Sequence, residues 1–247
     1  MANYTIEYWD GDNIDLEYND EKHTYMVGDR KVPSVTRVID AVFPKYLTEW
    51  AASCGADYWK ENYGEDNDMY NGILNAHKQI SHKAQNIGIE VHKWIELFIT
   101  VKILSNGKGE TIADYTDEVK VPMQNFHKWV ESRDIEWIAC EKKVYSRNWE
   151  YAGTIDALAK INGKLCVIDF KTSAKIYKEY YLQVAAYCNA IGEMMGELPK
   201  LGVIVRVDKE EDKFQEVAFD PWQHNDVFID ALNVKRFQSE RIKKIKL

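Results

Sequence analysis

The sequence predicts an α/β fold in which a central mixed β-sheet is flanked by helices and follows an N-terminal, mostly helical lobe. In the first half of the chain, up to residue 132, apolar residues recur at helical spacing. From residue 137 the pattern changes to three consecutive strands, followed by a helix, two further strands and a final helix. The length of 247 residues suits one large domain with a lobe, and we divide the chain into a hairpin and helical lobe at 1–85 and a core at 86–247.

The N-terminal lobe is predicted to contain one hairpin and two helices. Residues 19–32 alternate polar and apolar side chains around Gly28-Asp29, which indicates a hairpin. Ser34 is placed to cap a helix at residues 36–42, because its hydroxyl can accept a backbone N–H of the first turn. Residues 47–63 are rich in aromatic side chains and have a helical pattern.

Two further helices precede the sheet. The first carries one apolar stripe and ends near Gly107 and Gly109; its stripe falls at i, i+4, i+7, i+8 and i+11 and consists of Ile87, Val91, Trp94, Ile95 and Phe98. The second helix spans residues 117–132, and its inner face is predicted to hold Val121, Phe126, Trp129 and Val130.

Three strands are predicted in the middle of the chain, at residues 137–145, 151–160 and 164–171. Asn162-Gly163 is the strongest short hairpin turn in the sequence and joins the second of these strands to the third.

The C-terminal third continues the α/β pattern. A helix is predicted at residues 177–191, ending at Gly192, and a second hairpin pairs residues 201–207 with 214–219. Asp220-Pro221 then begins the last helix, since proline suits the first turn of a helix.

The composition excludes several classes of protein. It is ordinary for a globular chain, with 45% hydrophobic and 29% charged residues, which excludes disordered and fibrous proteins. No run of 18 apolar residues occurs and the first 12 residues lack an apolar segment, so we expect neither a membrane partner nor a signal peptide. The cysteines are far apart without a Cys-x-x-Cys pair, which indicates small buried residues in a reducing cytoplasm; they are Cys54, Cys140, Cys166 and Cys188.

The net charge of −8 is unevenly distributed. Residues 1–70 hold 15 acidic and six basic side chains, a net of −9, so the remaining residues carry about +1. The last 13 residues are basic, with Glu240 opposed by Lys235, Arg236, Arg241, Lys243, Lys244 and Lys246. This tail is either a solvated helix end whose cations suit the helix dipole or a surface that contacts phosphate.

Two carboxylates and a lysine meet on one face of the predicted sheet. Asp169 and Lys171 are two apart in a strand, so their side chains share a face. Extending the pairing from Asn162-Gly163 joins Lys160 to Leu165, Leu158 to Val167 and Asp156 to Asp169. The two carboxylates are then opposite each other, with Cβ atoms roughly 5 Å apart. The other face is apolar, with Ile155, Ala157, Ile168 and Phe170.

Such a pair of carboxylates is expected to hold a cation. Two unpaired carboxylates at this distance repel each other, and a hard divalent cation between them removes the repulsion. The cation polarises a phosphate and lowers the pKa of a bound water, while Lys171 orients that water or stabilises developing negative charge. The competing interpretation is a pair of exposed strand carboxylates with Lys171 as their ion-pair partner.

Four motifs in order resemble the PD-(D/E)XK nuclease superfamily. They are Gly88-x-x-x-His92, Gly153-Thr154-Ile155-Asp156, Asp169-Phe170-Lys171-Thr172 and Gln183-x-x-x-Tyr187. The set is most similar to the RecB-like branch, which includes bacteriophage exonucleases and the CRISPR-associated adaptation nucleases. It covers roughly 40% of the chain. Ile155 stands where the superfamily's name has proline, and Asp169 where it allows glutamate.

The resemblance implies a restriction-endonuclease-like core and a role for each matched residue. Asp156, Asp169, the backbone carbonyl of Phe170 and His92 would bind Mg²⁺ or Mn²⁺. Lys171 would be the catalytic lysine. Gln183 and Tyr187 lie on one helix face and would position Lys171 or the DNA. No cluster of cysteines follows Cys188, so we expect no iron–sulfur cluster.

Two further acids remain open. Glu96 is one turn beyond His92 and is either a hydrogen-bond partner of that histidine or a solvated carboxylate. Glu141 precedes the Asp pair by one strand and is a candidate for a supporting role.

The predicted function is hydrolysis of DNA phosphodiesters by a Mg²⁺- or Mn²⁺-dependent nuclease, with an exonuclease on single strands or duplex ends favoured. One alternative is an endonuclease of restriction, repair or spacer-processing type. Another is a DNA-binding module that kept the fold without turnover. We expect a cytoplasmic protein, and the resemblance extends this to a bacteriophage protein in its host's cytoplasm.

Overall fold

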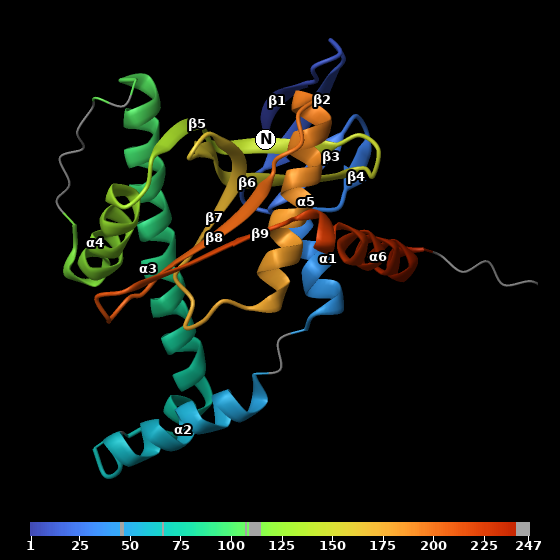
Figure 1. Ribbon diagram of the computed structural model, residues 1–247. Coiled ribbons are helices and arrows are strands. Elements are labelled where there is room, and N and C mark those ends of the chain that lie inside the picture. The colour runs from blue at the N-terminus through green and yellow to red at the C-terminus, as the bar shows by residue number, and fades with distance from the viewer. Residues whose placement is uncertain (45–46, 66, 107, 109–114, 241–247) are drawn as a thin grey trace, which may run out of the picture.

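The fold is built on a five-stranded mixed sheet (Figure 1). The computed structural model describes residues 1–44, 47–65, 67–106, 108 and 115–240. The strand order is β5-β6-β7-β8-β9, in which β7 and β8 are parallel and the other neighbours antiparallel. The strands are β5 (Ile135–Ser146), β6 (Tyr151–Ile161), β7 (Lys164–Lys171), β8 (Leu201–Val207) and β9 (Phe214–Phe219). This confirms the predicted α/β class.

Helices cover both faces of the sheet (Figure 1). The helices are α1 (Val35–Val42), α2 (Thr48–Asn62), α3 (Met69–Leu104), α4 (Asp117–Glu131), α5 (Lys178–Met195) and α6 (Trp222–Ser239). On one face, α3 and α4 pack against the sheet and enclose a hydrophobic cluster, here called the α4 core. It includes Val91, Ile95, Phe126, Trp129 and Phe170. On the other face, α1, α5 and α6 form the α5 core, which includes Val38, Leu158, Val167, Ile191 and Phe228.

A second, four-stranded sheet precedes the helices, although the sequence predicted only a hairpin there. Its order is β1-β2-β3-β4, with β1 (Ala2–Glu7), β2 (Asn13–Asn19), β3 (Thr24–Val27) and β4 (Arg30–Val32). The predicted turn at Gly28-Asp29 joins β3 to β4. The strands β1 and β2 each bury a single side chain, Ile6 and Leu16 respectively. Their sequences therefore show no clear alternation of apolar and polar residues, and they were not predicted. The division of the chain at residue 85 stays a prediction.

The structure confirms one predicted helix start and corrects one predicted helix end. Ser34 caps α1 as predicted, with its hydroxyl accepting the N–H of Arg37 at 3.3 Å. The helix α5 continues through Gly192 to Met195, and Gly196 with φ +68° forms its C-cap. Gly192 instead allows close packing, since a Cβ there would lie 2.6 Å from Leu198 Cδ2. In α4, Phe126 and Trp129 are buried and Val130 packs half-buried against the same core, as predicted. Val119 and Met123 are also buried, whereas Val121 is only half-buried.

The end of α3 also differs from the prediction. The helix ends at Leu104, and the predicted end signals Gly107 and Gly109 lie outside the described residues. Within the described ranges, every helix is either too short or too polar to traverse a lipid bilayer.

The hairpin of β6 and β7 has the predicted turn, and its register agrees with the prediction as far as Ala157 and Ile168. Asn162 and Gly163 have φ angles of +50° and +73°, which is the two-residue turn that Asn-Gly favours. Lys160 pairs with Leu165 and Leu158 with Val167, as predicted. The β6–β7 ladder ends at Ala157 and Ile168, so the predicted pair of Asp156 with Asp169 does not form. From there β6 remains paired with β5, and β7 with β8.

A network around Asp208 holds the loop that follows β7. Asp208 Oδ1 accepts the backbone N–H groups of Glu210 and Glu211, both at 3.0 Å. Its Oδ2 pairs with Arg206 at 2.6 Å, and Arg206 also donates to the carbonyl of Ser173, two residues after Lys171. Burial opposes ionisation of Asp208, but these donors lower its pKa from 3.8 to about 2.

The substitution Asp208→Asn should therefore lower the free energy of unfolding by about 2 kcal/mol at pH 7. A depressed carboxyl pKa adds stability above the unfolded value of 3.8, and that stability is lost as the pH falls toward 2. Urea unfolding at pH 7 and pH 3 should show the difference shrinking with acidity. Asp230→Asn, at an exposed position of α6, is the matched control. An equal loss at both pH values would contradict this role.

Candidate active site

The candidate site lies where β6 and β7 separate, between helix α3 on one side and α5 on the other. Asp156 of β6 stands just past the end of the ladder, and Asp169 and Lys171 close β7. Asp156 Oδ2 accepts the backbone N–H of Phe170 at 2.7 Å. This side-chain bond takes the place of a ladder bond, which explains why the two carboxylates are not a regular cross-strand pair. Ala157, Ile168 and Phe170 belong to the α4 core as predicted, whereas Ile155 belongs to the α5 core.

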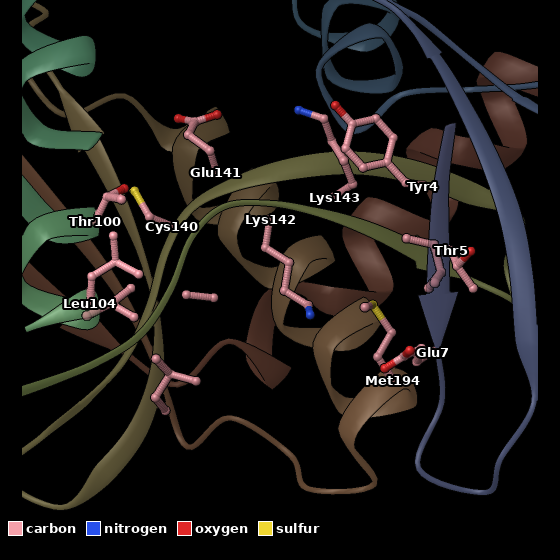
Figure 2. A pocket seen from close by; sticks show the side chains of 14 residues that line it. Tyr4, Thr5, Glu7, Thr100, Leu104, Cys140, Glu141, Lys142, Lys143 and Met194 are labelled. Atoms are coloured by element: carbon pink, nitrogen blue, oxygen red, sulfur yellow. The ribbon is translucent and has the colours of Figure 1, made fainter. Parts of the chain in front are cut away.

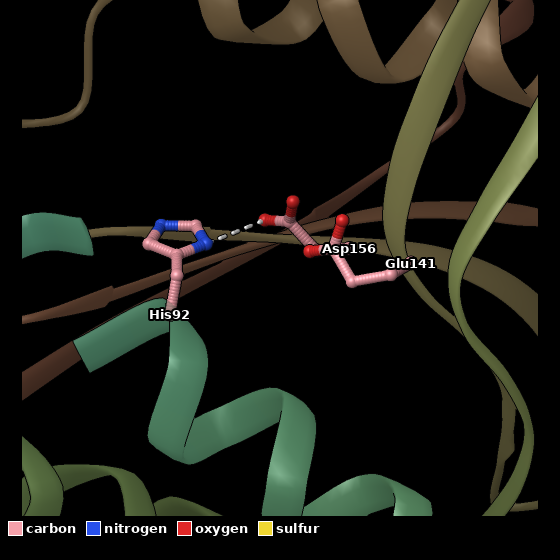
Figure 3. Close-up of side chains that lie close together, drawn as sticks. All are labelled: His92, Glu141 and Asp156. Atoms are coloured by element: carbon pink, nitrogen blue, oxygen red, sulfur yellow. Dashed lines mark ion pairs between the residues drawn. The ribbon is translucent and has the colours of Figure 1, made fainter. Parts of the chain in front are cut away.

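Helix α3 brings His92 to Asp156. His92 Nδ1 lies 3.8 Å from Asp156 Oδ2, as the dashed line in Figure 3 shows. The glycine one turn earlier permits this approach, since a Cβ on Gly88 would lie 3.0 Å from Thr172 Oγ1. The motif Gly-x-x-x-His thus combines a close helix–strand contact with a side chain directed at the carboxylate.

Glu141 completes a cluster with these two side chains. One ligand atom from each of His92, Glu141 and Asp156 lies within 4.8 Å of the others (Figure 3). The neighbouring pairs Cys140–Ala157 and Lys142–Ile155 put Glu141 opposite Asp156, and its φ of +48° marks a local distortion of β5. Burial, together with Asp156 and Glu96, raises the pKa of Glu141 to about 7.

Sequence reasoning gave Glu141 only as a supporting candidate. The position of Glu141 beside Asp156 depends on how β5 pairs with β6. No two-residue turn joins these strands, so the sequence did not predict their register. Glu96 is close enough to act on the charge of Glu141, and no hydrogen bond joins Glu96 to His92 among the described residues.

Asp169 is a buried carboxylate, and its exposed fraction is 1%. Its Oδ2 atom is paired with Lys171, whose Nζ lies 2.6 Å away. Its Oδ1 atom accepts no hydrogen bond from a described donor. Burial raises the pKa of Asp169 to about 6, although the lysine acts in the opposite direction. Lys171 offsets part of the cost of burying this charge, and Oδ1 remains free to bind a second cation.

Lys171 is held in one orientation by three neighbours. Besides Asp169, its Nζ donates to Gln183 Oε1 at 3.2 Å and lies 4.7 Å from the centre of the Tyr180 ring. Burial alone would lower the pKa of Lys171, but the carboxylates of Asp169 and Asp156 raise it above its ordinary value. The lysine is therefore a cation fixed beside the carboxylates.

Gln183 and Tyr187 of α5 form a second row behind Lys171. Gln183 Nε2 donates to the Tyr187 hydroxyl at 3.4 Å. Tyr187 packs on β6 at Gly153, where a Cβ would lie 2.5 Å from its Cε1 atom. The glycine of the Gly-Thr-Ile-Asp motif thus makes room for the tyrosine of the last motif. Tyr180, three residues before Gln183, was not predicted, although helical spacing places both on one face.

The donor set fits a hard divalent cation. Carboxylate oxygens and an imidazole are ligands that Mg²⁺ and Mn²⁺ accept, and the Oδ1 atom of Asp169 offers lone pairs that no described donor uses. His92, Glu141, Asp156 and Asp169 would hold the ion. The carbonyl of Phe170 stays a predicted ligand, since the contact that the structure gives for this residue here is through its N–H group.

A hollow of about 470 Å³ borders the cluster at Glu141, which belongs to both. It lies between α3, β5 and β1 (Figure 2). Lys142 and Lys143 leave β5 in different directions, Lys143 toward Tyr4 and Lys142 toward Met194. Lys143 Nζ lies 5.6 Å from the centre of the Tyr4 ring and 4.7 Å from that of Tyr18.

Comparison of the chain with curated proteins finds similarity to an exonuclease. No family model matches it. It is 26% identical over 171 residues to mitochondrial genome maintenance exonuclease 1 of Mus musculus. The match covers 65% of this chain and 44% of that protein, so the chain spans less than half the length of this relative.

Solved structures with some likeness include an alkaline exonuclease, LHK-Exo, from Laribacter hongkongensis. The match to that structure has 9% identity and a TM-score of 0.31, covering 57% of this chain and 81% of the other. The complex of LHK-Exo with dAMP gives 10% identity and a TM-score of 0.35, with 57% and 79% covered. The curated mouse relative is named an exonuclease, which agrees with the nuclease function that the motifs of this chain predict.

Proposed function

We propose that this protein is a Mg²⁺- or Mn²⁺-dependent nuclease that hydrolyses DNA phosphodiesters at the split between β6 and β7. The observation that carries the proposal is the cluster of His92, Glu141 and Asp156, with the buried ion pair of Asp169 and Lys171 close enough for its charges to interact with Asp156. A structural ion pair of Asp169 with Lys171 does not by itself account for three ligand-bearing side chains gathered beside it.

The chemistry divides between the ion and the protein's own side chains. A bound divalent cation supplies positive charge beside a phosphate and makes water more acidic. Lys171 remains protonated between the carboxylates, so its ammonium can donate to a phosphate oxygen as negative charge develops there. Gln183 holds this ammonium in place, and Tyr187 holds Gln183.

We favour an exonuclease acting on single-stranded DNA or duplex ends. This choice is supported by the name of the mouse relative. It is also supported by the order of the motifs, which resembles that of the RecB-like branch, a branch that includes bacteriophage exonucleases. The assignment to the RecB-like branch, the metal, the preference for DNA and the roles of the site residues are all parts of this proposal.

Replacing Lys171 with Ala or Asp169 with Asn should lower metal-dependent cleavage of an end-labelled DNA strand by at least about a hundredfold. The first change removes the ammonium, and the second removes the charge that faces the cation. Lys178→Ala, an exposed position at the start of α5, serves as the control and should retain activity. If either site variant cleaved like the parent protein, the assignment of the site would be wrong.

Glu141→Gln should weaken binding of Mn²⁺, measured by isothermal titration calorimetry, by at least roughly tenfold. The amide keeps the shape of the side chain and loses the charge that draws the cation. Glu136→Gln, at an exposed position of the same strand, is the control. Unchanged affinity in Glu141→Gln would remove this residue from the ligand set. No Mn²⁺ binding by the parent protein would favour a DNA-binding module without turnover.

Linear and closed-circular single-stranded DNA should separate the exonuclease from the endonuclease. Because an exonuclease needs a strand end, we expect degradation of the linear strand alone when both are incubated with Mg²⁺ or Mn²⁺ and resolved by electrophoresis. Cutting of the circles at a comparable rate would contradict the exonuclease assignment and support the endonuclease.

A further inference from the structure

A basic groove lies between the N-terminal hairpin and the end of the last described helix. The hollow has a volume of about 600 Å³ and is lined by β4, the start of α1, the β5–β6 turn and the last turns of α6. Its cations are Arg30, Lys31, Arg37, Lys235 and Arg236. Two acids also line it, Glu150 and Glu240, and Glu150 is paired with Arg30 at 2.7 Å. The groove is thus locally basic in a chain of net charge −8.

Three of these cations also support the fold. Besides the pair of Arg30 with Glu150, Arg37 donates to the carbonyl of Lys22 and Arg236 to the carbonyl of Trp149. Lys31 and Lys235 have no such role, since neither ammonium has a hydrogen bond or ion pair within the described residues. Two free cations facing one hollow from separate elements indicate an anionic ligand.

The groove is connected to the candidate active site through α1 and β6. The N–H of Ala152 donates to the carbonyl of Pro33 at 3.0 Å, which fixes the start of α1 on β6. Asp156 is four residues further along this strand, which corresponds to about 13 Å. In a B-form strand this distance spans about four phosphates.

A second hollow continues the surface toward the catalytic lysine. Arg37 lines the basic groove, whereas Thr36 lines a hollow with Tyr180 and Gln183, which are two of the three neighbours of Lys171. Asp40 and Glu179 also line this second hollow, and their negative charges would repel a phosphate. The basic groove is therefore the better phosphate site.

We propose that the basic groove binds the phosphate backbone of the substrate DNA strand several nucleotides away from the bond that is cleaved. The inference rests on the proposed function for the identity of the strand. The groove accounts for binding of an acidic protein to DNA through a local cationic surface. It also predicts that a strand must exceed a minimum length, about four phosphates beyond the site, before the groove contributes.

The test is the double variant Lys31→Gln/Lys235→Gln, compared with Lys164→Gln/Lys200→Gln. The control removes the same charge from two exposed positions at the opposite end of β7, near the Asn162-Gly163 turn. Fluorescence anisotropy would measure binding of a labelled single-stranded DNA longer than about ten nucleotides, in EDTA to prevent cleavage, over a range of salt concentrations.

The groove variant should bind this strand at least roughly tenfold more weakly, and its salt slope should fall by about 1.4, or 0.7 for each lost phosphate contact. Equal weakening in the groove and control variants, or no binding by the parent protein, would overturn the groove. Because binding is measured without metal, a parent protein that binds but never cleaves refutes the proposed function and leaves the test of the groove intact.

Discussion

The site depends on one hydrogen bond, from the backbone N–H of Phe170 to the side chain of Asp156. It satisfies a strand N–H at the point where the β6–β7 ladder ends, so the two strands separate without leaving that donor unpaired. Because the strands separate here, Asp169 has no cross-strand partner on β6, and its buried carboxylate pairs with Lys171. The other residues of the site lie around this separation of β6 and β7.

Small side chains let the surrounding elements come close enough to complete the site. Gly88 allows α3 to contact Thr172, which brings His92 to Asp156, and Gly153 gives Tyr187 its place on β6. Helix α5 then holds Gln183 against Lys171. The charges follow from this packing, because burial favours the neutral form of Asp169, whereas the two carboxylates keep Lys171 protonated.

The parts of the structure that are set by local chemistry could be predicted from the sequence. The Asn162-Gly163 turn fixes the register of the central hairpin, and Ser34 fixes the start of α1. Features that depend on contacts far apart in the chain could not be predicted in this way. Glu141 enters the cluster through a distorted residue in β5, and the strands β1 and β2 are stabilised by pairing although each buries one side chain. Gly192 was predicted to be a helix end because glycine often ends helices. The reason for this glycine is instead its close contact with Leu198, which the sequence alone does not show.

We propose that the split between β6 and β7 binds a divalent cation through Asp169 and its neighbours. Anomalous X-ray diffraction from crystals soaked in Mn²⁺ tests this directly. We predict an anomalous peak within about 2.5 Å of a carboxylate oxygen of both Asp156 and Asp169, with Glu141 or His92 also in contact. Full occupancy by Mn²⁺ elsewhere, with Asp169 still bound only to Lys171, would contradict the account.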